Sequence, residues 1–460
     1  MSKFLKVSAQ LLSIFILLSL YVSRMLGLFI VLPVLAIETM NYPGYSALTL
    51  GLVMGLYGLT QAVLQVPLGQ LSDRVGRFTV VFIGLLVFAL GSYLCASAET
   101  MTQLMIGRAL QGAGAISSSL MAWVVDLTGE DKRARTMALI GISIGISFLA
   151  SLVIGPALLP WRGLSGLFEL TAGLAVLGAL LSLALPRPTP VRSMGAIFDL
   201  GLVREMWRTP GIPGAVLGVG VLHALLMAMF LALPPLWVNA SLAPDEHAKL
   251  YLIMMIAGAG PAFLMVGFVE ARHRLMWGQK MALAAMAVAF AWMAGASTNV
   301  VGLVIAGSLF FFGFSLLEAT LPSLLAKAAP VRGRGTATGL YATVQFMGAF
   351  VGGLIGGPLY ELLGSIGLFA TLAIGCCVWV AIRYRTPEPP RHRSKLVPVA
   401  MEIRTAAQWQ QCLANVPGVV DVAVSPQERL AYLKVSKDSL DESALAEALS
   451  GPATQTAQTT

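Results

Sequence analysis

The chain has 460 residues, of which 57% are hydrophobic and only 11% are charged, and its mean hydropathy is +0.81. Because soluble domains carry about 25% charged residues, this composition excludes an ordinary soluble protein. The net charge of +8 comes from short basic segments between apolar runs. No separate basic domain is present in the sequence, so nucleic acid is not an expected partner.

Apolar runs of about 20 residues recur along most of the chain and match the roughly 30 Å hydrocarbon core of a bilayer when they are helical. The alternating pattern of a membrane β-barrel strand is absent from the sequence. Since lipid cannot satisfy backbone polar groups, each run is predicted to be a membrane-spanning α-helix. Twelve such helices are expected, at 10–37, 46–70, 78–98, 102–126, 135–158, 164–185, 212–239, 247–269, 279–297, 300–326, 335–360 and 365–383.

The basic residues indicate the orientation of these spans. The first span follows Lys3 and Lys6 as a signal peptide would, but its apolar run continues past Arg24 and is too long for a cleaved signal. One side of the predicted membrane then holds nearly all the loop Lys and Arg residues, and the other holds only Arg162 and Lys249. Short basic loops stay in the cytoplasm, so both termini are predicted to be cytoplasmic.

Between the second and third spans, residues 69–77 read GQLSDRVGR and are predicted to form a cytoplasmic loop. The two glycines allow a tight turn and a close helix approach. Asp73 and Arg77 lie four residues apart with opposite charges, and Asp126 ends the fourth span on the same side. We expect a latch that gates the protein; the alternative is that the arginines only fix the topology. The predicted gating residues are Gly69, Asp73, Arg74, Gly76, Arg77 and Asp126.

Three ionisable residues fall in the middle of predicted spans: Arg24, His223 and Glu318. A charge at the bilayer centre costs about 2.5–3.5 kcal/mol on insertion scales, so such residues usually face a cavity and have a function. Glu318 beside His223 or Arg24 is predicted to carry a proton. The alternatives are a structural ion pair for Glu318 and Arg24, and a hydrogen-bonded core residue for His223.

Amide and aromatic side chains within the spans are candidates for the substrate pathway. Amides can line such a pathway, but they can equally hold helices together. Arg108 and Gln111 lie one helical turn apart in the fourth span, where a structural pair is the alternative to a role in transport. The predicted pathway residues are Gln61, Gln65, Gln111, Phe230, Gln345 and Phe346.

Three pairs of landmarks repeat along the chain at nearly one offset. Leu32–Pro33 matches Leu233–Pro234, Gly155–Pro156 matches Gly357–Pro358, and Asp73–Arg77 matches Glu270–Arg274. The common offset predicts two six-helix halves, 1–185 and 212–385, joined by a basic linker at 186–211. Two parallel repeats form a transporter architecture with a substrate site at their interface.

After a basic linker at 386–395, residues 396–452 have the composition of a soluble domain. Their periodicity predicts strand, helix, strand, strand, helix, with Ser436 or Ser439 capping the last helix. Cys412 stands alone in the first of these helices, and soft metals prefer paired thiolates, so no metal is expected. Residues 453–460 are predicted to be disordered.

With these motifs, the chain resembles the major facilitator superfamily over roughly residues 10–385. GQLSDRVGR is similar to the family's motif A, and IGRALQGAGA, from Ile106, is similar to motif B. Gly155–Pro156 is similar to part of the antiporter motif C, although Leu158 and Leu159 replace the small residues usual there. More closely, the chain resembles inner-membrane members of the drug:proton antiporter group that carry a small C-terminal domain.

This resemblance implies an all-α polytopic membrane protein with the 12-helix major facilitator fold, plus a small α+β ferredoxin-like C-terminal domain. It implies that Asp73, Arg77 and Asp126 form a charge relay that stabilises the outward-facing state, and that Arg108 assists proton transfer. The expected location is the bacterial inner membrane. The expected function is proton-coupled efflux of small apolar or amphipathic solutes by alternating access.

Two alternatives remain open. One is a proton symporter or facilitator, and the other is a membrane sensor that signals through its C-terminal domain to a cytoplasmic partner or ligand. The sequence contains no P-loop and no nucleophile–base arrangement, so an ATP-driven pump and an enzyme are not expected. The expected partners are lipid, protons and a small-molecule substrate, with no cofactor, and the protein is expected to be a monomer.

Overall fold

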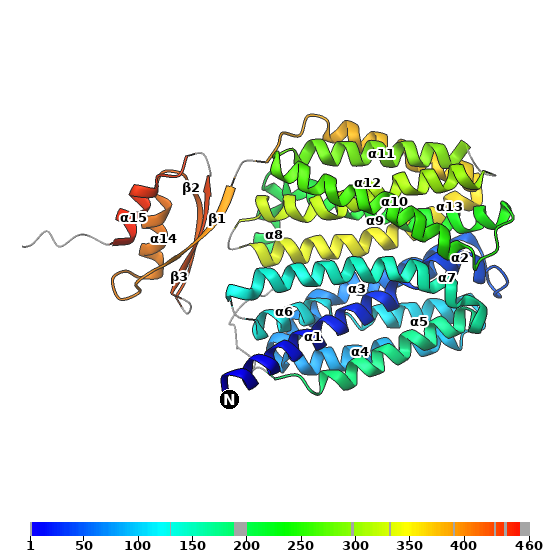
Figure 1. Cartoon of the computed structure of the whole chain (residues 1–460), viewed down its shortest axis with the longest axis horizontal. Helices are drawn as coiled ribbons and strands as arrows, with labels where there is room; N and C mark the ends of the chain where they lie inside the picture. The colour runs from blue at the N-terminus through cyan, green and yellow to red at the C-terminus, as the bar shows by residue number, and fades with distance from the viewer. Residues whose placement is uncertain are drawn as a thin grey trace, which may run out of the picture.

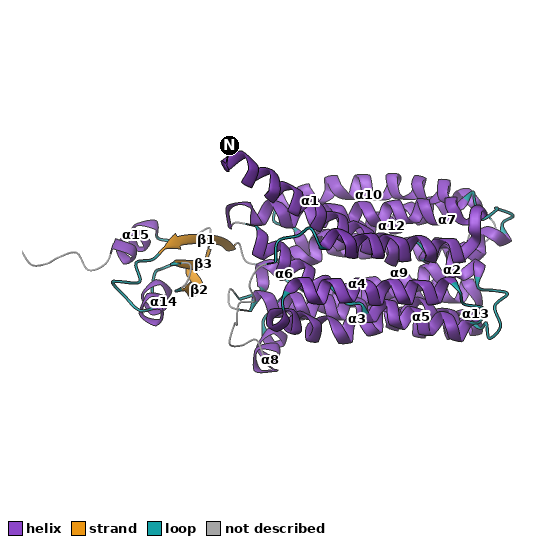
Figure 2. Ribbon diagram, turned by 90° about the horizontal axis from the view of Figure 1, so that it is seen from below, coloured by secondary structure: helices purple, strands orange, loops and turns teal. Residues whose placement is uncertain are grey.

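The computed structural model describes residues 2–128, 130–187, 200–295, 299–330, 333–389, 392–426, 429–436 and 439–450. A bundle of long helices lies beside a small α/β domain formed by the C-terminal residues (Figure 1). We call the end of the bundle nearer this domain the tail end, and the opposite end the far end. Figure 2 shows the same arrangement from below, with all strands in the small domain.

The first six predicted spans form the helices of the N-terminal half. The elements are α1 (Ser2–Phe29), α2 (Leu32–Glu38), α3 (Ala47–Val75), α4 (Arg77–Ala96), α5 (Met101–Ala113), α6 (Ser117–Leu127) and α7 (Glu130–Ser182). The first span is broken before Pro33, because proline favours the first turn of a new helix. The fourth is broken between α5 and α6. Helix α7 contains the fifth and sixth spans, separated by non-helical Arg162 and Gly163.

The C-terminal half repeats this plan with fewer breaks. Its elements are α9 (Ile212–Asn239), α10 (His247–Ala271), α11 (Leu275–Gly295), α12 (Val300–Ala328) and α13 (Arg334–Arg383). Helix α13 contains the last two spans, separated by Gly364 at φ +65°. A further helix, α8 (Leu200–Arg208), lies within the predicted linker, of which residues 188–199 fall outside the described part.

Hydropathy and length agree with a membrane-spanning bundle. Eight of the described helical segments are long and apolar enough to cross a membrane, and the segments in α7 and α13 each hold two predicted spans. At the far end, short polar side chains cap the N-termini of two helices. Ser46 and Thr100 cap α3 and α5 in reciprocal pairs with Thr49 and Gln103, which satisfies backbone N–H groups that have no partner within the helix.

The two halves contact each other through α3 with α13, α7 with α10, and α2 with α9. The first contact is made by glycines: a side chain at Gly51 would meet the backbone of Gly353, and one at Gly357 would meet the backbone of Ala47. Glycine permits this close helix approach. Since Ala47 and Gly357 lie near the far end, the halves are packed together there.

The C-terminal domain has the predicted order of elements: β1 (His392–Pro398), α14 (Ala406–Ala414), β2 (Val419–Ser425), β3 (Leu430–Ser436) and α15 (Glu442–Ser450). Its antiparallel sheet has the order β1-β3-β2, with His392 opposite Ser436 and Pro398 opposite Leu430. Trp409, Leu413 and Leu433 form part of its core. The strands lie between the bundle and the two helices (Figure 1).

Two local predictions for this domain differ from the structure. Strand β1 begins at His392, inside the predicted basic linker, because pairing with β3 rather than hydrophobicity defines its start. The cap of α15 is Asp441 rather than Ser436 or Ser439. Its Oδ1 accepts hydrogen bonds from the Ser443 hydroxyl (2.6 Å) and the Ala444 N–H (2.9 Å), and these bonds lower the pKa of Asp441. The predicted disordered segment, 453–460, lies outside the described residues.

Candidate functional site

The GQLSDRVGR motif is helical rather than a loop, so that prediction was wrong. Helix α3 continues through Val75, and only Gly76 separates it from α4. The apolar pattern ends near residue 70, but a helix does not need apolar residues to continue beyond the membrane. Gly76 has φ +96° and ψ 144°, a conformation that essentially only glycine adopts. The motif therefore fixes an abrupt reversal between two helices.

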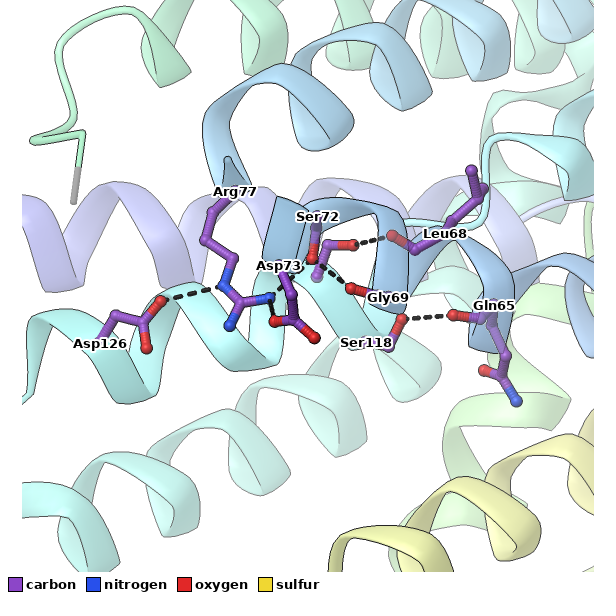
Figure 3. Close-up of polar contacts among 9 residues, drawn as sticks. Gln65, Leu68, Gly69, Ser72, Asp73, Arg77, Ser118 and Asp126 are labelled. Carbon is purple, nitrogen blue, oxygen red and sulfur yellow. Dashed lines mark hydrogen bonds and ion pairs between the residues drawn. The ribbon is translucent and has the colours of Figure 1, made fainter. Parts of the chain in front are cut away.

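The charged residues of the motif meet the end of α6 at this reversal (Figure 3). Arg77 forms an ion pair with Asp73, as their spacing predicts, and its Nε donates to Oδ2 of Asp126 at 3.0 Å. Its third contact is a 2.7 Å hydrogen bond from NH1 to the Ser72 hydroxyl. One guanidinium thus joins the α3–α4 turn to α6, while Arg74 is exposed.

Serine hydroxyls extend this connection along α3 and α6. Ser72 donates to the carbonyl of Gly69 (2.6 Å), and Ser118 donates to the carbonyl of Gln65 (2.7 Å) (Figure 3). A side chain at Gly69 would come within 2.9 Å of the Ser118 hydroxyl, which explains why a residue without a side chain lies there. One side of the motif is therefore packed against α6.

The C-terminal half has an equivalent ion pair that sequence reasoning did not identify. Glu270, at the end of α10, pairs with Lys327 near the end of α12 at 2.5 Å and accepts a hydrogen bond from Ser323. The repeat matched Glu270 to Asp73 and Arg274 to Arg77. Lys327 lies near the end of α12, as Asp126 lies near the end of α6. This parallel in the sequence could have identified Lys327 as the partner of Glu270.

Three predicted residues form a hydrogen-bonded chain inside the C-terminal half. Gln345 of α13 donates to Oε1 of Glu318 (3.4 Å) on α12 and lies 2.9 Å from Nε2 of His223 on α9. The other ring nitrogen of His223, Nδ1, lies 3.1 Å from the Val219 carbonyl and must donate to it. His223 Nε2 is then left to accept from Gln345. Within the described chain, Oε2 of Glu318 is buried and has no partner.

Arg24 does not join this chain. Its NH1 donates to the carbonyl of Gly114 at 2.7 Å, and its NH2 donates to the Tyr57 hydroxyl at 3.0 Å and to Gln61. All of these partners belong to the N-terminal half. The structure thus brings together Glu318 and His223, as one prediction had it, but not Glu318 and Arg24. Sequence position alone could not separate these two outcomes.

Arg108 and Gln111 are paired on one face of α5, with NH1 of Arg108 donating to Oε1 of Gln111 at 2.8 Å. Nε of Arg108 donates to the carbonyl of Val53 (3.2 Å), and Gln111 donates to the Ser92 hydroxyl (2.8 Å). Both side chains are fully buried. The pair therefore joins α5 to α3 and α4.

The predicted pathway residues divide into two groups. Gln65 and Phe346 lie between the halves: Gln65 donates to the Thr343 hydroxyl of α13 (3.0 Å), and Phe346 packs against the apolar core of the N-terminal half. Phe230 is completely buried against Tyr251, with ring centroids 5.9 Å apart. It lies in an apolar cluster that includes residues of both halves, and its place in the substrate pathway stays a prediction.

Among the residues that the structure describes, no group of three or more His, Cys, Asp or Glu side chains could hold a metal ion. Cys412, the lone cysteine of the C-terminal domain, lies 2.7 Å from NH1 of Arg404.

Comparisons with known proteins identify the family and support the fold. The Major Facilitator Superfamily matches residues 17–353. The chain is 36% identical to Inner membrane transport protein YajR of Escherichia coli (strain K12), over 90% of this chain and 91% of that protein. It is 25% identical to Multidrug resistance protein MdtL of Shewanella oneidensis, over 75% of this chain and 88% of that protein. The crystal structure of nucleoside transporter NupG has the same fold, with a TM-score of 0.65, 15% identity, and coverage of 81% of this chain and 98% of that one.

Proposed function

The chain belongs to the major facilitator superfamily of membrane transporters, and on this premise we propose that it is a proton-coupled exporter that works by alternating access. The observation that carries this proposal is the hydrogen-bonded chain of Glu318, Gln345 and His223 inside the bundle. Ionisable side chains at membrane depth characteristically belong to proton relays. The name of the relative MdtL supports export.

In this mechanism Glu318 is the proton carrier. As a carboxylate it accepts the hydrogen bond from Gln345, and on protonation it becomes a weaker acceptor and gains a donor of its own. The Gln345 amide then bonds mainly to His223, which connects α9 and α13 more strongly than α12. Protonation thus changes which helices of the C-terminal half are held together, and this change is the link to conformation.

The ion pairs at the tail end act as the gate. Arg77 holds the α3–α4 turn to α6, and Lys327 holds α12 to α10, so each half moves as a rigid body. We assign the tail end to the cytoplasm of a bacterium, because the short basic segments gather there and the relative YajR is named an inner-membrane protein. The halves meet at the far end, and opening there requires the contact between α3 and α13 to separate.

A second candidate is a sensor that signals through the C-terminal domain. It is favoured by one set of contacts: Lys434 of β3 donates to the carbonyls of Ala328 (3.1 Å) and Ala329 (3.2 Å) at the end of α12. Glu388, in the segment leading to the domain, accepts hydrogen bonds from the N–H groups of Met276 (2.9 Å) and Trp277 (3.1 Å). The domain is therefore connected to the same half that carries Glu318.

The test is ligand-dependent proton movement in proteoliposomes, followed with a pH-sensitive dye and a panel of cationic, neutral and anionic compounds. We expect proton release with particular compounds, and we expect Glu318→Gln to abolish it. Glu361→Gln is the matched control, because Glu361 is an exposed carboxylate at the far end. Equal proton signals in the Glu318→Gln protein and the unmodified protein would reject the carrier role. Compound binding without any proton signal would favour the facilitator or sensor alternatives.

A further inference from the structure

The break in the fourth span leaves a helix N-terminus inside the bundle. Helix α6 begins at Ser117, directly after Gly114–Ile116, and its N-cap Ile116 offers no side-chain acceptor. The first N–H groups of a helix have no partner within the helix. The hydroxyls of Ser118 and Ser119 donate to backbone carbonyls of α3. The positive end of the α6 dipole is therefore uncapped within the span.

A buried arginine lies beside this N-terminus. Arg24 is only 2% exposed, and its NH1 contacts the carbonyl of Gly114, three residues before α6 begins. Gln61 connects the two features, since its Oε1 accepts from Arg24 and its Nε2 donates to the Ser117 hydroxyl at 3.3 Å. Arginine remains charged in proteins, and no described carboxylate lies within ion-pair distance of Arg24. Two sources of positive potential thus lie together without an anion.

A purely structural role accounts for only part of this arrangement. The NH1 group of Arg24 donates a hydrogen bond to the carbonyl of Gly114, at the C-terminal end of α5. A cation is favourable there because the C-terminus of a helix carries a partial negative charge. However, Nε of Arg24 is buried without a partner in the described part of the chain. A hydrogen-bonding group buried without a partner costs free energy, as does a buried charge without a counter-ion. Both costs are removed if an anion binds there.

We propose that Arg24 and the N-terminus of α6 form an anion-binding site that receives the carboxylate of an amphipathic organic anion, and that such anions are the exported substrates. The planar guanidinium matches a carboxylate geometrically, and uncapped helix N-termini bind anions through their N–H groups. The apolar part of the solute has suitable surroundings, because Tyr57, Phe88 and Phe346 pack in the same apolar cluster. Since Phe346 comes from the other half, the site is next to the interface between the halves. This inference rests on the proposed transport function.

The test measures the thermal unfolding of the purified full-length protein with benzoate, with its uncharged analogue benzamide, and with chloride. We expect a saturable rise in the unfolding midpoint with benzoate and no rise with benzamide. Chloride is expected to be at least about tenfold weaker than benzoate, because it cannot use the apolar surface. Equal responses to benzoate and benzamide would overturn the proposal, as would a response to chloride that benzoate does not reproduce.

The decisive variant is Gln61→Glu, which adds a carboxylate next to Arg24 without changing the size of the side chain. We expect it to fold and to lose the benzoate response, because its own carboxylate occupies the site. The matched control is Gln279→Glu: Gln279 is also buried and accepts a 2.9 Å hydrogen bond from a buried arginine, Arg383, in the other half. It should respond to benzoate like the unmodified protein. An unchanged response in Gln61→Glu would refute the site.

The two proposals fail separately. Glu318→Gln should keep the benzoate response while it loses proton-coupled transport. Benzoate binding without proton coupling in any variant would reject the exporter and retain the anion site. Proton-coupled export restricted to cations, with a Gln61→Glu protein that transports normally, would reject the anion site and retain the exporter.

Discussion

In the N-terminal half, Arg77 lies between two carboxylates, Asp73 and Asp126, whereas in the C-terminal half Glu270 lies between one cation, Lys327, and the Ser323 hydroxyl. Both arrangements join the ends of corresponding helices. The chemistry at their centres is nevertheless inverted, because a cation is central in one half and an anion in the other. Two halves derived from one plan thus keep the position of a contact and change its charges.

The membrane-embedded residues differ in the same sense. The N-terminal half buries Arg24 and Arg108, each bound to a glutamine of its own half. The C-terminal half holds Glu318, which is linked through Gln345 to His223. A permanent cation is suited to holding a negative group, and a carboxylate is suited to carrying a proton. Our two proposals accordingly place solute recognition in the N-terminal half and proton transfer in the C-terminal half.

The largest expected effect comes from removing the central cation of the N-terminal arrangement. Arg77→Met leaves Asp73 and Asp126 without their shared partner, and we expect a loss of about 2 kcal/mol of stability. If this free energy stabilises one conformational state of the transport cycle, the transport rate in proteoliposomes should fall by at least about tenfold. Lys327→Met should cost less, because Glu270 keeps Ser323.

The control for this pair is Arg274→Met, which removes the exposed residue that the repeat matches to Arg77. Its unfolding midpoint and transport rate should stay near those of the unmodified protein. If Arg274→Met were as damaging as Arg77→Met, net positive charge at the tail end, rather than a specific ion pair, would explain both results.

The turns between the paired helices offer a second comparison. The repeat places Gly76 opposite His273, which has φ +53°. A residue other than glycine in such a conformation carries strain of about 1–3 kcal/mol, so Gly76→Ala should lower the unfolding free energy by that amount. His273→Gly should change it by less than about 1 kcal/mol, since glycine also gains entropy in the unfolded chain. Chemical denaturation of both variants measures the two changes in unfolding free energy. An equal loss in both would contradict the prediction, because it would show that the two turns are not under comparable strain.

The smallest effect concerns the C-terminal domain, which contacts the end of α12 through Lys434. Lys434→Met removes the two hydrogen bonds to Ala328 and Ala329, and we expect a cost of about 1 kcal/mol at this contact. Hydrogen exchange should then rise at the end of α12 and in β3, with the core of the domain unchanged. Unaltered exchange at the end of α12 would show that the domain is not coupled to the bundle.

The apolar runs predicted the spans, because membrane burial imposes a length and a composition on each helix. The breaks within the spans were harder to predict from the sequence. Gly114–Ile116 contains no proline, and the interruption depends on Arg24, ninety residues earlier, to satisfy the carbonyl that it exposes. Likewise, α3 extends through the polar residues 72–74 because Arg77 and Asp126 stabilise that end through contacts between helices.

The candidate site was predictable only where a pattern was local. The four-residue spacing of Asp73 and Arg77 predicted their ion pair. The partners of Glu318 depend on how α9, α12 and α13 are rotated about their axes, and apolar residues surround these helices on all sides. Hydropathy carries little rotational information in such helices, so the sequence left both His223 and Arg24 open as neighbours.

The glycine contact between α3 and α13 has a consequence for opening at the far end. At Gly51, Gly353 and Gly357 the two helices meet backbone to backbone, and no long side chain is inserted into the opposite helix. At these three positions, separating the helices requires no long side chain to leave a fitted hole. Side-chain resistance to opening along this contact therefore comes from elsewhere on the two helices, from Phe346 and from the hydrogen bond between Gln65 and Thr343.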